Sequence, residues 1–152
     1  MKLDQFENDG IVVDKALGFW LNRVYQRLRT DMYRAFAERG EDVTPEQWMV
    51  LIRLWEREGL TQSELSDLTL RDAPTMSRIV QGMEERGLLE RRKSPEDARV
   101  RTVFLTKTGH ALRKKLVPVA RMLVERAVRG IPERDLRTFR SVLERMFENL
   151  EP

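Results

Sequence analysis

Three helix-start signals follow one another closely in the middle of the chain, and they constrain the fold more than any other feature. The segments Thr44–Gln47 (TPEQ) and Thr61–Glu64 (TQSE) have the spacing of a capping box, in which two side chains bond each other's backbone amides. The segment Asp72–Pro74 (DAP) places a capping residue just before a proline, which is also typical of a helix start. Gly59 and Gly87 are expected to end helices. The pattern predicts three short helices joined by tight turns.

The hydrophobic period changes after the third of these helices. Residues Leu88–Arg92 and Val100–Leu105 are expected to be extended, because apolar and polar residues alternate in the second segment. Turn formers and charges between them, in Lys93–Arg99, predict a projecting hairpin loop. We therefore expect a mainly α fold with a small β-hairpin wing, and a winged helix-turn-helix over residues 44–108.

Longer helical patterns flank this unit. From about Val12 to Arg39 apolar residues recur every three or four positions, which predicts a helix of roughly 26 residues and about 39 Å. A helix of that length outreaches a compact core and needs a partner to cover it. A last helix over residues 132–150 has the apolar spacing of a helix packed on another chain, with a seam of Leu136, Phe139, Leu143, Met146 and Leu150. We expect residues 12–40 and 109–150 to form a helical dimerisation region from the N- and C-terminal helices.

The helix that starts at Asp72 has two different faces. One face is an apolar stripe suited to a core, and the opposite face is short and polar, with Thr75, Ser77, Arg78 and Gln81. Arginine can bond guanine through two acceptors, glutamine can pair with adenine, and threonine or serine can bond bases or phosphates. The same residues are also ordinary on an exposed helix, so it is their place between a capped helix and a basic hairpin that predicts DNA contact.

Charge is unevenly distributed along the chain. The 152 residues carry a net charge of +3, yet the stretch from Arg71 to Lys115 holds 12 basic and 6 acidic residues. The remainder is therefore slightly acidic. A basic middle suits a polyanionic partner such as double-stranded DNA, although a solvated surface would have the same composition.

Four segments of the chain resemble the MarR (multiple antibiotic resistance regulator) family of bacterial transcription factors. They are Leu60–Leu65, Pro74–Val80, Glu84–Arg91 and Asp97–Thr106. The last segment matches the family's wing pattern DxRxxxxxLT at every fixed position. The outer helices fit as well, since family members dimerise through their first and last helices. The turn over residues 69–73 departs from the family, because it is a residue shorter than is common.

The resemblance implies a homodimer that places two copies of the fourth helix in successive major grooves of a pseudo-palindromic operator. It also implies that Arg99 reaches the minor groove from the wing, beside the basic Lys93, and that Asp97 orients an arginine. A narrow minor groove attracts arginine, which agrees with that role. The backbone amides of Thr61, Gln62 and Ser63, at a helix N-terminus, are expected to bind phosphate.

Many relatives of this kind release DNA when a small aromatic anion binds. Trp20, Arg23, Trp48 and Trp55 are candidates for such a ligand pocket, with Arg23 neutralising a carboxylate. Tryptophans at helical spacing are more often core residues, and that interpretation stays open. His110 could join the pocket or lie on the surface. The chain has no cysteine, which excludes the peroxide-sensing branch of the family.

The sequence therefore predicts a sequence-specific DNA-binding transcriptional regulator, most simply a repressor. An alternative is a winged-helix module for protein–protein contact without specific DNA binding, which the basic wing argues against. An enzyme is not expected, because no acid–base or nucleophile set is found, and with one histidine and no cysteine we expect neither a metal site nor a cofactor. The chain shows no signal peptide and no membrane-spanning run, so we expect a cytoplasmic bacterial protein without membrane contact.

Overall fold

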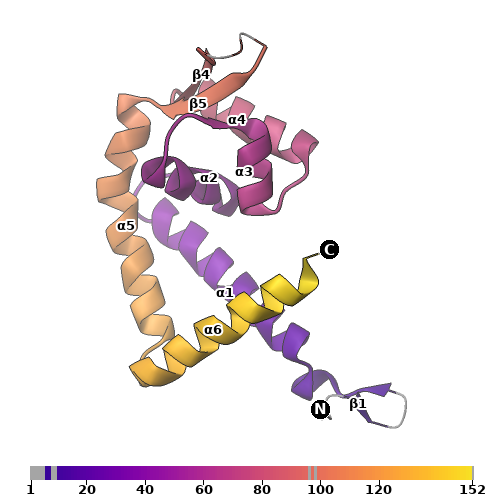
Figure 1. Ribbon diagram of the computed structural model, residues 1–152. Helices are drawn as coiled ribbons and strands as arrows, with labels where there is room; N and C mark the ends of the chain where they lie inside the picture. Colours follow the sequence, from indigo (N-terminus) through magenta and orange to yellow (C-terminus); the bar gives the residue numbers. More distant parts are fainter. Residues whose placement is uncertain (1–5, 8–9, 96, 98, 152) are drawn as a thin grey trace.

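The structure is a computed structural model that describes residues 6–7, 10–95, 97 and 99–151. Its elements follow in the order β1 (Phe6–Glu7), β2 (Gly10–Ile11), η1 (Val13–Lys15), α1 (Leu17–Ala37), α2 (Pro45–Glu56), β3 (Leu60–Thr61), α3 (Gln62–Thr69), α4 (Ala73–Glu85), β4 (Leu89–Lys93), β5 (Arg101–Leu105), α5 (Lys107–Ala127) and α6 (Glu133–Leu150). A unit of short helices and a sheet lies at one end, and α1, α5 and α6 extend away from it (Figure 1).

The capping signals begin the helices at the predicted places. Thr44 and Gln47 form a complete capping box at α2, and Thr61 and Glu64 form another at α3. At α4 the Asp72 carboxylate accepts a hydrogen bond from the Thr75 amide at 2.8 Å. These bonds satisfy amides that have no partner within the helix, so each helix start is determined by local sequence.

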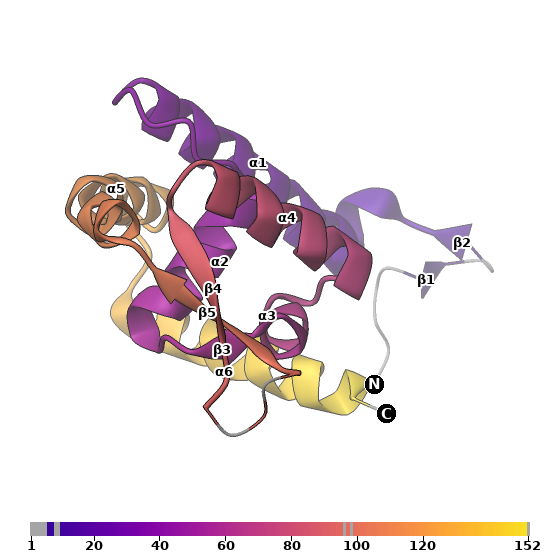
Figure 2. The ribbon, with the colours of Figure 1, turned by 90° about the horizontal axis from the view of Figure 1, so that it is seen from above.

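The sheet has three antiparallel strands in the order β3-β5-β4. Strands β4 and β5 form the expected hairpin, with Leu89 opposite Leu105 and Lys93 opposite Arg101. Strand β3 was not predicted: Leu60 pairs with Val103 although the strand has only two residues. A strand so short has no detectable period. It joins the wing to the start of α3, so the wing is paired along its β5 edge as well (Figure 2).

One core holds the winged helix-turn-helix together and includes α5. It contains the stripe of α4, namely Met76, Val80 and Met83, each with no exposed surface. It also contains apolar residues of α1, α2, α3, the sheet and α5. Burial of these side chains favours folding through the hydrophobic effect.

The N-terminal helix is shorter than predicted. Val13–Lys15 is a 3₁₀ turn, Ala16 has an extended backbone with ψ 116°, and α1 has 21 residues from Leu17. The apolar period continues through this break, which is why the sequence pattern placed the helix start too early.

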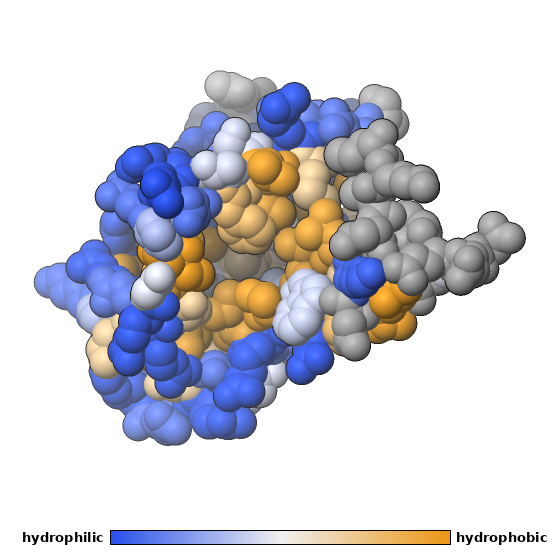
Figure 3. Space-filling model, turned by 90° about the horizontal axis from the view of Figure 1, so that it is seen from below, coloured by the Kyte–Doolittle hydropathy of each residue, from blue (hydrophilic) through white to orange (hydrophobic). Residues whose placement is uncertain are grey.

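The last helix α6 contains no buried residue. Several of its apolar side chains are exposed, including Phe139 at 52% and Leu150 at 81%, and Leu136, Leu143 and Met146 are half-buried. Exposed apolar residues also lie on α1, such as Leu17 and Val24. Seen from below, apolar side chains gather around a hollow rimmed by hydrophilic ones (Figure 3). None of the described helices is long and apolar enough to cross a membrane.

Candidate DNA-binding surface

The polar face of α4 is ordered by a chain of hydrogen bonds that begins at its N-terminus. Asp72 accepts from both the amide and the hydroxyl of Thr75, each at 2.8 Å. The Thr75 oxygen in turn accepts from Nη2 of Arg78 at 3.3 Å. The bond from the Thr75 amide is the main cause of a lowered pKa at Asp72, so this carboxylate stays charged. Arg78 is exposed, and its bond to Thr75 holds its side chain along the helix.

The other predicted residues of α4 differ in exposure. Gln81 is exposed and donates from Nε2 to Glu85 at 2.9 Å, and Ser77 is half-buried. Because Met76 and Val80 point into the core, the helix cannot rotate without exposing them. The polar face is thus fixed in orientation relative to the whole unit.

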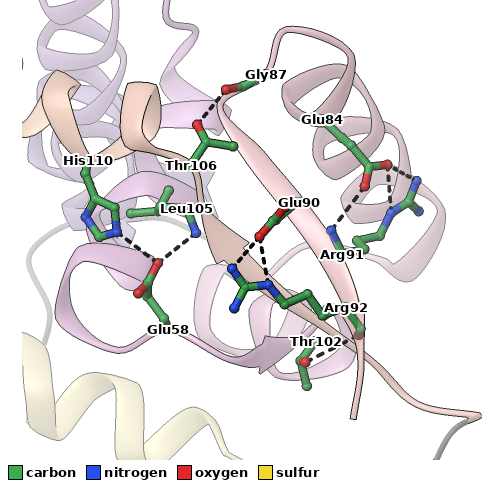
Figure 4. A network of polar contacts seen from close by, with 10 residues as sticks. All are labelled: Glu58, Glu84, Gly87, Glu90, Arg91, Arg92, Thr102, Leu105, Thr106 and His110. Carbon is green, nitrogen blue, oxygen red and sulfur yellow. Dashed lines mark hydrogen bonds and ion pairs between the residues drawn. The ribbon is translucent and has the colours of Figure 1, made fainter.

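An ion pair with two side-chain hydrogen bonds joins α4 to strand β4 of the wing (Figure 4). Arg91 of β4 donates to Oε2 of Glu84 on α4 through Nη2, and through Nε at 3.0 Å. The Arg91 amide donates to the other carboxylate oxygen at 3.1 Å. This bonding holds the pKa of Glu84 below its usual range, with the Arg91 side chain as the main cause.

The same arginine reaches the start of α3. Its Nη1 donates to Oε1 of Gln62 at 3.4 Å, so Arg91 connects α3, α4 and the wing. The N-terminus of α3 carries the three predicted phosphate contacts Thr61, Gln62 and Ser63, of which Ser63 is exposed. Glu84 and Arg91 were not predicted as site residues. The signal was available in the sequence, because they flank the glycine turn that returns the chain to the sheet.

The wing presents its basic residues at its outer end. Lys93 is exposed and lies opposite Arg101, where the hairpin leaves the sheet. In the loop, Asp97 Oδ1 accepts from the backbone amide of Arg99 at 2.9 Å. This bond holds the backbone of the turn, and the orientation of an arginine side chain by Asp97 stays a prediction. The Arg99 side chain is exposed.

The base of the wing is held by a separate set of contacts. Glu58 accepts from the Leu105 amide at 2.7 Å and lies 3.2 Å from Nε2 of His110 (Figure 4). Thr106 donates to the Gly87 carbonyl at 2.6 Å and caps α5. His110 is exposed and lies at the base of the wing, beside Glu58.

The four residues predicted for a ligand pocket do not come together in the chain. Trp48 and Trp55 pack against each other at 5.6 Å between ring centroids and lie against the core. Trp55 also donates to the Gly109 carbonyl at 3.1 Å. Trp20 and Arg23 instead lie near the start of α1, where the guanidinium is 5.3 Å from the indole centroid.

The distance along α1 separates these two pairs. Trp48 contacts Phe36 at 5.1 Å between centroids. Trp20 precedes Phe36 by four and a half turns of helix, which is about 24 Å at the rise of an α-helix. The core interpretation is therefore the better one for Trp48 and Trp55.

Comparison with known proteins identifies this arrangement. The model of the MarR family matches residues 43–100, which span α2 to the wing. The chain is 34% identical over 133 residues to the HTH-type transcriptional repressor IacR of Pseudomonas putida, covering 88% of this chain and 78% of that protein. The chain belongs to the MarR family. It is therefore a DNA-binding transcriptional regulator.

Two further relatives extend the comparison of this MarR-family chain. The HTH-type transcriptional repressor NicR of Pseudomonas putida is 30% identical over 119 residues, covering 78% of this chain and 74% of NicR. The crystal structure of CouR from Rhodococcus jostii bound to p-coumaroyl-CoA superimposes with a TM-score of 0.79 at 25% identity, covering 89% of this chain and 94% of CouR. Family members act on DNA as dimers.

Proposed function

We propose that this chain is a homodimeric repressor that binds a pseudo-palindromic operator through α4 and the wing. The observation that carries the proposal is the ordered polar face of α4, where Asp72 and Thr75 hold an exposed Arg78. In this proposal residues 44–108 form the DNA-binding unit, and residues 12–40 and 109–150 form the dimerisation region.

Each predicted contact has a defined task in this proposal. Arg78 and Gln81 read bases in the major groove, and Thr75 and Ser77 bond bases or phosphates beside them. The amides of residues 61–63 bind a phosphate at the N-terminus of α3. Lys93 and Arg99 bring positive charge to the backbone and the minor groove, where a narrow groove attracts arginine.

A second copy of the chain is the proposed cover of the apolar face. The seam of α6 has no buried residue and α1 carries exposed apolar residues, and contiguous exposed apolar surface of this kind marks an interaction site. A two-fold axis would bury the same residues of both copies, so each contact counts twice. It would also place the two copies of α4 on one side of the dimer.

Repression and its release are also part of the proposal. IacR and NicR are named as repressors, and CouR was crystallised with an anionic aromatic thioester. We infer that this chain represses transcription and that an organic anion relieves repression. The chain itself would then perform no catalysis.

Selection of bound fragments from genomic DNA tests this function directly. The expected result is one enriched motif with two inverted half-sites, bound by the purified protein with an affinity that falls steeply as salt rises. Enrichment of no motif, together with weak binding that does not depend on sequence, would overturn specific regulation and favour a protein–protein module.

A further inference from the structure

Arg91 lies where the three parts of the proposed DNA-binding surface meet. All three nitrogens of its guanidinium group donate within the protein: Nε and Nη2 to Glu84, and Nη1 to Gln62 at 3.4 Å. Its side chain is only 31% exposed, and the Glu84 carboxylate balances its charge. Arg91 is therefore a basic residue of the wing whose charge and donors are engaged inside the DNA-binding unit.

The contact with Arg91 decides which end of the Gln62 carboxamide is available. A guanidinium group has only hydrogen-bond donors, so it selects the carboxamide oxygen. The Nε2 amino group then points away from Arg91, and among the described residues none accepts a hydrogen bond from it. Gln62 is the first residue of α3, where the proposed function places a phosphate. A phosphate has only acceptors, so it needs this end of the carboxamide.

We propose that Arg91 is a positioning residue for DNA binding: its bond to the Gln62 oxygen presents Nε2 of Gln62 to a backbone phosphate, and Arg91 itself does not touch DNA. The proposal rests on the proposed function, because it concerns how α3 and the wing share the operator. The same arginine bonds Glu84 of α4, so the phosphate contact at α3 keeps a fixed place relative to the base-reading face of α4.

The capping box of α3 leaves room for such a side-chain donor. The Thr61 amide donates to Oε2 of Glu64 at 2.7 Å, and the Glu64 amide donates to the Thr61 hydroxyl at 3.1 Å. These two amides are thus engaged, and of the amides of residues 61–63 only those of Gln62 and Ser63 remain for a phosphate. A side-chain donor from Gln62 replaces the donor that the capping box uses.

A direct bond between Arg91 and a phosphate is the competing interpretation, and salt dependence separates the two. Each cation that neutralises a phosphate contributes about 0.9 to the slope of log K against log salt, so a dimer with two such contacts would lose about 1.8 without them. The double variant Glu84→Gln with Arg91→Gln removes the ion pair without changing the net charge. We expect it to bind the operator more weakly than the wild type, with an unchanged salt slope.

A double-mutant cycle tests the connection between Arg91 and Gln62. Arg91→Lys keeps the charge and the pairing with Glu84, but its single nitrogen is expected to lose Gln62. Arg91→Lys and Gln62→Met should each weaken operator binding by about tenfold, the effect of one charged hydrogen bond, and together they should weaken it no further. Fluorescence anisotropy with the selected operator measures these affinities.

Arg92→Lys is the matched control for this cycle. It is the same substitution at the next residue of β4, whose side chain lies on the other face of the strand and pairs with Glu90 (Figure 4). We expect it to bind the operator as the wild type does. Circular dichroism establishes that each variant is folded, and the Gln62 variants test the phosphate donor even where Arg91→Lys is unfolded.

Gln62→Glu separates positioning from a purely structural role. It strengthens the bond to Arg91 and adds an acid to the first turn of α3, so urea titration should show it at least as stable as the wild type. It lacks the Nε2 donor, so we expect operator binding at least tenfold weaker. A structural role alone predicts unchanged operator binding.

Four results would overturn the assignment of Arg91 and Gln62. They are wild-type operator affinity in Gln62→Glu, additive losses in the cycle, a shallower salt slope in the double variant of Glu84 and Arg91, or an equal loss in Arg92→Lys. Each is measured against a wild type that binds its operator. A wild type that binds no operator would overturn the proposed function, and this proposal with it.

Discussion

At the residue scale, the wing turn depends on one carboxylate. Asp97 accepts from the Arg99 amide at 2.9 Å, and the Val100 amide donates to the Asp97 carbonyl at the same distance. The side-chain bond brings Arg99 back toward the strand. It also puts a negative charge close to the proposed path of DNA.

Two substitutions separate these effects of Asp97. Asp97→Asn keeps an oxygen acceptor and removes the charge, so it should bind the operator more tightly than the wild type. Asp97→Ala also removes the charge but loses the turn bond, and should bind more weakly than Asp97→Asn by about 0.5–1.5 kcal/mol. Operator titrations measure the affinities of both variants. Equal affinities for the two variants would mean that the turn bond has no role in DNA binding.

A different experiment concerns Arg78. Arg78→Ala should lose about 1–3 kcal/mol of discrimination at one base pair in each half-site, while non-specific binding is largely kept. Binding-site selection with the variant shows which position relaxes. Gln81→Ala is the matched comparison and should relax another base pair. An unchanged motif for Arg78→Ala would assign Arg78 to phosphate or to no contact.

At the scale of elements, substitutions of two helical glycines are expected to have opposite effects on stability. A Cβ on Gly109 would lie 2.1 Å from the Leu88 carbonyl oxygen, whereas a Cβ on Gly82 would meet no atom within 4 Å. Gly109→Ala should therefore lower the free energy of unfolding by about 1–3 kcal/mol or more, through overpacking against backbone. Gly82→Ala should raise it by up to about 1 kcal/mol, because alanine favours a helix. Urea denaturation followed by circular dichroism distinguishes them. A stable Gly109→Ala variant would contradict the close packing of α5 on the wing.

The contact between α4 and the wing predicts a dependence of stability on pH. Hydrogen bonding to Arg91 lowers the pKa of Glu84 in the folded state. The stability from this pair is present above the unfolded pKa, which is about 4.3 for glutamate, and is lost as pH falls through the lower folded pKa. The wild type should therefore lose stability on acidification below about pH 5.

The Glu84→Gln variant tests that assignment. Its free energy of unfolding, measured by urea titration at several pH values, should fall less steeply with acidification than that of the wild type. Glu85→Gln serves as the control, because its side chain is exposed and makes no ion pair with described residues. Parallel curves for wild type and Glu84→Gln would show that the ion pair does not couple to folding.

Elements differ in how far the sequence could predict them. The starts of α2, α3 and α4 depend on bonds between residues three apart, so local sequence predicted them. Strand β3 depends on pairing with Val103, far along the chain, and had no local signal. Trp48 and Trp55 pack against each other, whereas Trp20 lies near the start of α1, a separation that a shared residue type does not reveal.

At the scale of the whole molecule, dimerisation depends on the seam of α6. Leu143 and Met146 lie on this seam and are half-buried in the single chain. Leu143→Glu with Met146→Glu should dissociate the dimer, because each apolar side chain fully buried stabilises by about 1.5–3 kcal/mol and a two-fold axis counts it twice. Sedimentation velocity measures the mass. The control Ser141→Glu with Arg145→Glu adds acids to the exposed opposite side of α6 and should stay dimeric. A dimeric Leu143→Glu, Met146→Glu variant that binds the operator normally would show that α6 is not the interface.

The division of α4 into two faces bears on how such regulators diversify. Met76, Val80 and Met83 are fully enclosed, while Arg78 and Gln81 are exposed. Exchanges on the exposed side typically change stability by less than about 0.5 kcal/mol. A duplicated gene could therefore acquire a new operator through a few substitutions on one side of this helix. The descendant protein would keep the fold, while substitutions on the exposed face of α4 could change its DNA-binding specificity.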